Sequence, residues 1–171
     1  KGQPIMKTIL LSTAAALIAA SAASAQETEG KFNLGAGYTL VDGDGVEFDT
    51  LTVRGGYDFT EFFGVEGEAL FGLGDEDVAG LDASLNYGLG AYLKAQYPLA
   101  DAVSVFGRVG YTWVEAELEG FGSDDSDGLG YGAGVEYAFA GPNAVRVEYT
   151  RYDLEDDAEA DAYSVSYVRR F

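Results

Sequence analysis

Hydrophobic and polar positions alternate along most of the chain after residue 30. Eight segments of about ten residues carry apolar or aromatic side chains at every second position, with small, polar or charged ones between them. Because the side chains of a β-strand point alternately to opposite faces, the pattern predicts strands with one apolar and one polar face. The segments are Lys31–Val41, Phe48–Phe59, Phe62–Leu73, Ser84–Tyr97, Val103–Val114, Leu129–Phe139, Ala144–Tyr152 and Ala162–Phe171.

The length of these segments favours a membrane-spanning barrel. A tilted strand needs about 9–11 residues to cross a bilayer, and no stretch after residue 26 is apolar over the ~18 residues that a transmembrane helix needs. Aromatic side chains gather near the segment ends and aliphatic ones in the middle, as belts at the headgroup level require. We therefore predict an all-β fold, an eight-stranded antiparallel up-and-down transmembrane β-barrel whose apolar face meets lipid.

The opposite face of the predicted strands carries charges of both signs. Five basic and four acidic side chains nearly balance there, and we predict that they pair in the barrel lumen. Eight strands enclose an interior just wide enough for side chains to fill, which favours a packed polar interior over a gated path for small solutes. The predicted network consists of Arg54, Glu66, Glu68, Lys94, Arg108, Glu136, Arg146, Glu148 and Arg170.

The connections between the predicted strands alternate in length. Residues 60–61, 98–101 and 140–143 form short turns, with Pro98 and Pro142 inside them, whereas 42–47, 74–82, 115–127 and 153–161 form long loops. The long loops, together with Asp49 beside the first of them, hold 20 of the 29 acidic residues and no Lys or Arg, so we expect repulsion to keep them extended, mobile and soluble. An even strand count returns both termini to one side of the membrane, which we take to be the periplasm.

Two further interpretations of the acidic loops stay open. Residues 42–45 and 123–128 could collect a divalent cation that bridges to lipid phosphates, although neither has the spacing of an EF-hand. The acidic surface could also engage a basic partner. Apart from such cations, we expect no cofactor.

The composition excludes several classes of function. With no His and no Cys, the chain lacks the residues of Ser-His-Asp and Cys-His catalysis and of common zinc sites. Glu66 and Glu68 lie on one face two residues apart, but pairing with Arg54 and Arg108 accounts for them better than acid–base catalysis. The net charge of −19 would repel nucleic acid. We expect neither an enzyme nor a nucleic-acid-binding protein.

The first residues predict export. Lys7 follows Met6, the run 9–20 is apolar but too short to cross a bilayer, and the small residues 21–25 end in Ala23-Ser24-Ala25. We predict a signal peptide over residues 6–25, preceded by upstream residues 1–5 and cleaved between Ala25 and Gln26. The mature domain, residues 26–171, then has 8 basic and 29 acidic residues, a net charge of −21.

Several short motifs together resemble those of a known family. In order and spacing they resemble the motifs of the small eight-stranded outer-membrane barrels, the opacity-like porin family that shares the membrane domain of the outer-membrane protein A superfamily. The motifs are residues 35–38, 54–59, 64–68, 106–111, 132–137 and 147–149, with the terminal Phe171. The resemblance implies insertion by the barrel assembly machinery through a last-strand signal, matched here by Tyr163, Val165, Tyr167 and Phe171. Arg169 departs from that signal, where an apolar residue is expected.

Pattern and resemblance together lead to one functional expectation. We expect a monomeric protein of the outer membrane of a Gram-negative bacterium, with a structural or surface-interaction role. A narrow small-solute porin is the alternative, and a secreted soluble barrel is a third. Outer-membrane lipids and the assembly machinery are the expected partners, together with an unnamed partner at the surface.

Overall fold

The computed structural model describes residues 31–43, 46–78, 81–118, 122–155 and 158–171, with the backbone alone for 75–84 and 116–125 within these ranges. The described chain is nearly all strand. The predicted signal peptide, residues 6–25, and its cleavage residues Ala23, Ala25 and Gln26 lie outside the described part. The strands are β1 (Lys31–Gly43), β2 (Val46–Asp58), β3 (Phe63–Gly72), β4 (Asp75–Val78), β5 (Leu81–Ala100), β6 (Val103–Leu118), β7 (Gly122–Ala140), β8 (Asn143–Leu154) and β9 (Glu159–Arg170).

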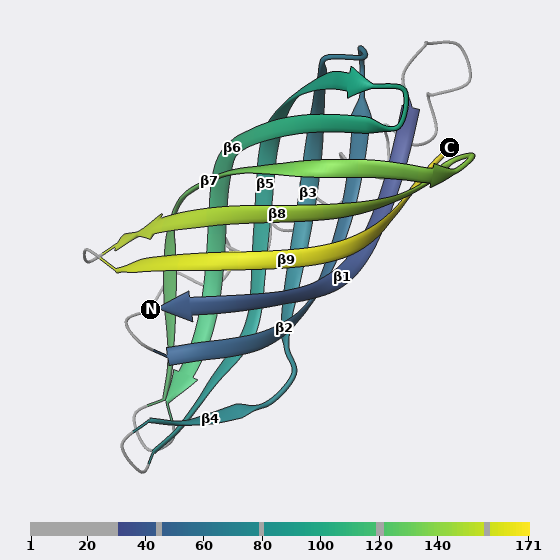
Figure 1. Ribbon diagram of the computed structural model, residues 1–171. Coiled ribbons are helices and arrows are strands. Elements are labelled where there is room, and N and C mark those ends of the chain that lie inside the picture. Colours follow the sequence, from purple (N-terminus) through teal and green to yellow (C-terminus); the bar gives the residue numbers. More distant parts are fainter. Residues whose placement is uncertain (1–30, 44–45, 79–80, 119–121, 156–157) are drawn as a thin grey trace. The chain divides into compact units, whose positions relative to one another are not determined.

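Eight of these strands close into a barrel (Figure 1). Apart from β3 and β4, consecutive strands pair antiparallel. β1 also pairs with β9, and β3 pairs directly with β5, which leaves β4 outside the ring. Closure gives every barrel strand a hydrogen-bonded neighbour on both sides, and a bilayer demands this because it offers no water to unpaired backbone groups. The predicted eight-stranded antiparallel barrel is confirmed.

The two ends of the barrel differ. Short turns join β2 to β3, β5 to β6 and β7 to β8 at one end, called the short-turn end below, where Lys31 and Arg170 also lie. The hairpins β1–β2, β4–β5, β6–β7 and β8–β9 extend from the other end, called the hairpin end.

The predicted long loops are mostly strand, which corrects the expectation of irregular segments. β6 and β7 pair as far as Leu118 and Gly122, so little of the predicted loop 115–127 remains as a turn. Strands extend in the same way into the predicted loops 42–47, 74–82 and 153–161. Backbone hydrogen bonds between strands form regardless of side-chain polarity. The alternation of apolar and polar residues disappears where both faces of a hairpin meet water, so the sequence pattern does not show that the strands continue.

Pro98 lies within β5 and not in the turn where the sequence predicts it. β3 pairs with β5 only as far as Phe63 and Ala95, so beyond that point one edge of β5 has no neighbouring strand. A proline lacks the N–H that such an edge would otherwise offer and is therefore tolerated there. The ladder to β6 shifts register between Pro98 and Ala100, after which the chain turns.

A second irregularity reverses two predicted orientations near the start of β5. The register with β6 shifts between Leu85 and Tyr87. As a result Leu85, predicted to face lipid, is buried in the interior, and Asn86, predicted to face the lumen, is exposed and donates to Glu115 at 3.3 Å. An extra residue on one strand of a ladder moves the residues beyond it to the opposite face.

The outer face of the barrel is apolar with aromatic side chains at both ends. Three tyrosines at the hairpin end donate their hydroxyls to aspartates on the neighbouring strand, each two residues from the tyrosine's cross-strand partner. The pairs are Tyr38 with Asp49, Tyr111 with Asp127 and Tyr149 with Asp161. This is the boundary where apolar surface meets charge, and it suits amphipathic tyrosine. In the described residues no helix is long and apolar enough to cross a membrane.

Candidate functional site

The barrel interior is the candidate functional site because charged side chains from seven strands meet there. Of the nine residues of the predicted network, eight are at most 5% exposed to solvent. The ninth, Arg170, has a side chain 30% exposed near the short-turn end. Ionised groups buried this deeply persist only when they are paired and hydrogen-bonded.

Glu68 and Glu148 form the centre of the network, each lying between the same two arginines. Arg54 Nε lies 2.5 Å and Arg108 Nη1 2.8 Å from Glu68 Oε2. Arg108 Nη2 lies 2.5 Å and Arg54 Nη2 3.4 Å from Glu148 Oε1. The four groups therefore form a closed ring of alternating charge. Hydroxyls that donate to it or accept from it belong to Thr150, Tyr152, Ser164 and Ser166.

Arg146 joins this ring to a second set of carboxylates. Its Nη1 and Nη2 atoms donate to the two oxygens of Glu66 at 3.0 and 2.7 Å, the bidentate geometry that makes Arg–carboxylate pairs strong. Nη2 also lies 3.1 Å from Glu136 Oε2, and Arg170 donates to the other oxygen of Glu136. The ring of Phe106 covers the Arg146 guanidinium at 4.4 Å, a cation–π contact.

Asp58 completes the network, and the sequence reasoning did not include it. Lys94 Nζ lies 2.8 Å from Asp58 Oδ1 and 3.3 Å from Glu66 Oε1, and Asn33 Nδ2 donates to Asp58 Oδ2 at 3.1 Å. Asp58 lies four residues after Arg54 on the same inward parity of β2, so the alternation itself could have identified it. With Asp58 the network has five acidic and five basic groups and is formally neutral.

An apolar layer lies in the interior toward the hairpin end, and the sequence analysis did not identify it as a layer, although the alternation places Tyr92 on the inward face. Val41, Leu70 and Leu85 are buried there with Tyr92, Tyr152 and Ala162. Arg108 lies 4.1 Å over the ring of Tyr92, which links the layer to the ion pairs. A Cβ at Gly90 would come within 2.5 Å of the same ring, so glycine is what makes room for Tyr92. The alternation could have identified Val41 and Leu70, because they occupy positions of β1 and β3 whose side chains point into the barrel.

This arrangement leaves little solvent access to the ion pairs at the centre of the lumen. A water-filled channel past them would leave their side chains accessible, but eight of the network residues are at most 5% exposed. The acids and bases neutralise one another, and the apolar layer fills the interior beside them. Chemically, such an interior can hold the strands in register.

The residues of the predicted assembly signal lie at the outer surface of the last strand. Tyr163, Val165 and Tyr167 are exposed on β9. Phe171 follows the strand and donates its backbone N–H to the carbonyl of Phe32 at 2.8 Å. Arg169 also points outward, with its guanidinium 5.6 Å from the ring of Phe171. Recognition of these residues by the assembly machinery stays a prediction.

The two candidate cation segments fall partly outside the described side chains. Residues 44–45 are not described, and for 123–125 the structure gives the backbone alone. Among the described side chains, no group of three or more acidic residues is arranged to hold a metal ion. Cation binding at the hairpin end therefore stays a prediction.

The sequence matches a family model over nearly its whole length. The model for the outer membrane protein beta-barrel domain matches residues 11–171. The chain belongs to this family. It is accordingly an integral β-barrel protein of the Gram-negative outer membrane, as expected from alternation and resemblance. No curated protein matches the sequence.

Solved barrels from three groups of bacteria share the fold. Ail, the attachment invasion locus protein of Yersinia pestis, is 21% identical, with a TM-score of 0.63 over 84% of this chain and 100% of Ail. OprG of Pseudomonas aeruginosa is 14% identical, with a TM-score of 0.60 over 84% and 97% of the two chains. Neisserial surface protein A is 15% identical, with a TM-score of 0.56 over 83% and 97%. At these identities the likeness concerns the fold alone.

Proposed function

We propose that this protein is a closed barrel that conducts no solute and that serves the outer membrane as a structural element and as a surface for contacts outside the cell. The single observation that carries the proposal is the burial of the lumen charges, eight of which are at most 5% exposed. Opening a path would require separating ion pairs such as Arg108–Glu148 and displacing the apolar layer as well. Breaking one buried pair costs about 3–5 kcal/mol, so spontaneous opening is rare.

The test is conductance of the mature barrel in a planar lipid bilayer. Wild type is expected to insert without discrete current steps. Arg108→Ala removes a partner from both Glu68 and Glu148, whereas Arg151→Ala, at the hairpin end, leaves the lumen intact and is the matched control. Current steps in wild type that change with Arg108→Ala but not with Arg151→Ala would overturn the proposal in favour of the narrow porin.

For the outer surface, we propose that the hairpin end faces the outside of the cell and binds cationic partners. The predicted loops at this end, with Asp49 beside the first of them, hold 20 acidic residues and no basic one. Arg151 lies just before the last of these loops, 153–161. Its guanidinium pairs with Asp153, Glu159 and Asp161, so it does not offset the acidic charge of the other loops. Ail was crystallised with sucrose octasulfate, a heparin analogue and thus a polyanion. The acidic hairpins of this chain would repel such a ligand and attract one of opposite charge.

A further inference from the structure

A row of small residues crosses the outer face of three adjacent strands. Ala95 of β5 pairs with Gly107 of β6, and Gly107 pairs with Ala133 of β7. The row begins at Phe63, the partner of Ala95, and ends at Tyr149, the partner of Ala133. These five positions lie side by side, so the small ones form the floor of a groove and the two aromatic ones its ends.

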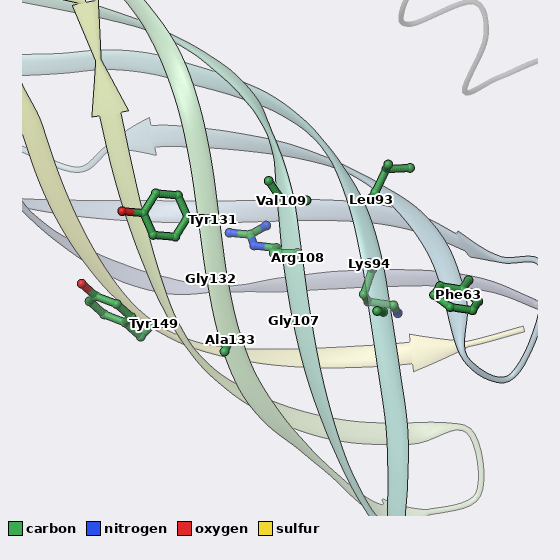
Figure 2. A pocket seen from close by; sticks show the side chains of 11 residues that line it. Phe63, Leu93, Lys94, Gly107, Arg108, Val109, Tyr131, Gly132, Ala133 and Tyr149 are labelled. Carbon is green, nitrogen blue, oxygen red and sulfur yellow. The ribbon is translucent and has the colours of Figure 1, made fainter.

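Large apolar side chains form the walls of this groove. On one side of the floor, Val109 is the cross-strand partner of both Leu93 and Tyr131, and each of the three lies two residues along its strand from a floor residue. Figure 2 shows them in a row beside the floor. The hollow on this side has a volume of about 620 Å³. A smaller hollow of about 230 Å³ lies on the other side of Ala95 and Gly107, against Tyr97 and Val105.

The groove lies on the lipid-facing surface and runs obliquely between the two aromatic ends. Phe63 lies next to the short-turn end, and the Tyr149 hydroxyl donates to Asp161 at the hairpin end. Four strand spacings of about 4.8 Å make the groove roughly 19 Å long. Lys94, Arg108 and Gly132 also line it, but the side chains of Lys94 and Arg108 are buried in the lumen network. The outward-pointing side chains of the lining are apolar except for the hydroxyls of Tyr131 and Tyr149, both at the end nearer the hairpins.

We propose that this groove holds one acyl chain of an outer-membrane lipid, in preference to the lipids around the rest of the barrel. The groove is one side chain wide, which suits a polymethylene chain and is too narrow for a strand or helix of another protein. A second copy of the chain would also bring two strongly acidic hairpin ends together. The ester and headgroup atoms would lie beside the hydroxyls of Tyr131 and Tyr149.

The recognition concerns the acyl chain and not an anionic headgroup. Arg151, the cross-strand partner of Tyr131, is a basic side chain beside this end of the groove. Its three carboxylate partners leave it no net positive charge to offer a lipid phosphate. Dipalmitoyl phosphatidylethanolamine is therefore an adequate probe.

Native mass spectrometry of the mature barrel with this lipid tests the proposal. Wild type is expected to retain one lipid at collision energies that remove all others. Gly107→Leu places a side chain on the floor, where an added Cβ would meet only ordinary contact, 3.7 Å from the Gly132 carbonyl oxygen. Excluding about two methylene groups should lower the lipid-bound fraction roughly tenfold. Gly55→Leu, also outward-facing but outside the groove, should retain the lipid as wild type does.

Three results would overturn the proposal. The first is equal retention by wild type and Gly107→Leu, and the second is no retained lipid in wild type. The third is a dimer that Gly107→Leu abolishes, which would assign the groove to a second copy. The slower gel migration of the barrel after heating verifies that each variant is folded, and Ala133→Leu fills the same floor should Gly107→Leu fail to fold.

Discussion

At the scale of single residues, the lumen carboxylates are held by shared arginines. Arg108 contacts both Glu68 and Glu148, and it also lies over the ring of Tyr92. Removing it leaves two buried carboxylates with one partner fewer each. By contrast, Arg151 has three carboxylate partners but a side chain 29% exposed, so water can replace them.

We therefore predict that Arg108→Ala lowers the free energy of unfolding by about 3–5 kcal/mol, whereas Arg151→Ala lowers it by about 1 kcal/mol or less. Urea unfolding of the barrel in phospholipid bilayers, followed by the fluorescence of Trp113, the single tryptophan, measures both. Adding Glu68→Ala to Arg108→Ala should cost less than the two changes separately. Equal losses in the two arginine variants would contradict the assigned roles.

At the scale of elements, the irregularity in β5 decides which side chains enter the interior. Further along β5 the alternation is regular: Tyr92 and Lys94 face inward, on the parity that the sequence predicts for the lumen. The register shift between Leu85 and Tyr87 turns Leu85 into the apolar layer instead of toward lipid. Nothing in the alternation marks this shift, because Leu and Asn occupy the parities expected of an uninterrupted strand.

Leu85→Ala is accordingly expected to lower the free energy of unfolding by about 2–3 kcal/mol, since it leaves a cavity in a buried layer. Asn86→Ala, next to it on the exposed face, should change it by less than about 1 kcal/mol. The same urea titration compares the two variants. An equal or larger effect at Asn86 would mean that β5 follows the regular alternation there.

At the scale of the whole molecule, charge is divided unevenly. The lumen network takes five basic and five acidic residues and is neutral, so the net charge of the mature chain lies outside it. Most of that charge is in the hairpins, which the ladders hold as paired strands. Their field reaches about 8 Å at physiological ionic strength, so contacts with a charged partner depend on salt.

A lysine decapeptide should therefore bind the barrel in nanodiscs of zwitterionic lipid, and heparin should not. Surface plasmon resonance at increasing salt measures both, and binding of the peptide should weaken steadily. Glu47→Gln with Glu155→Gln, at the hairpin end, should reduce it. Glu61→Gln with Asp101→Asn, at the short-turn end, removes equal charge and should leave it unchanged. Binding that both pairs reduce equally would argue against recognition by the hairpin end.

The sequence by itself determined the fold class, most of the lipid-facing surface and the inward position of the nine charged residues, because strand periodicity and membrane thickness act on local sequence. Only the tertiary structure decided which charges meet. Arg54 and Glu148 are 94 residues apart, and the register of the intervening strands and the closure of the ring bring them together. Three other features depend in the same way on how neighbouring strands pair: the inclusion of Asp58 in the network, the orientation of Leu85 and the groove floor at Gly107. The alternation within a single strand does not predict that pairing.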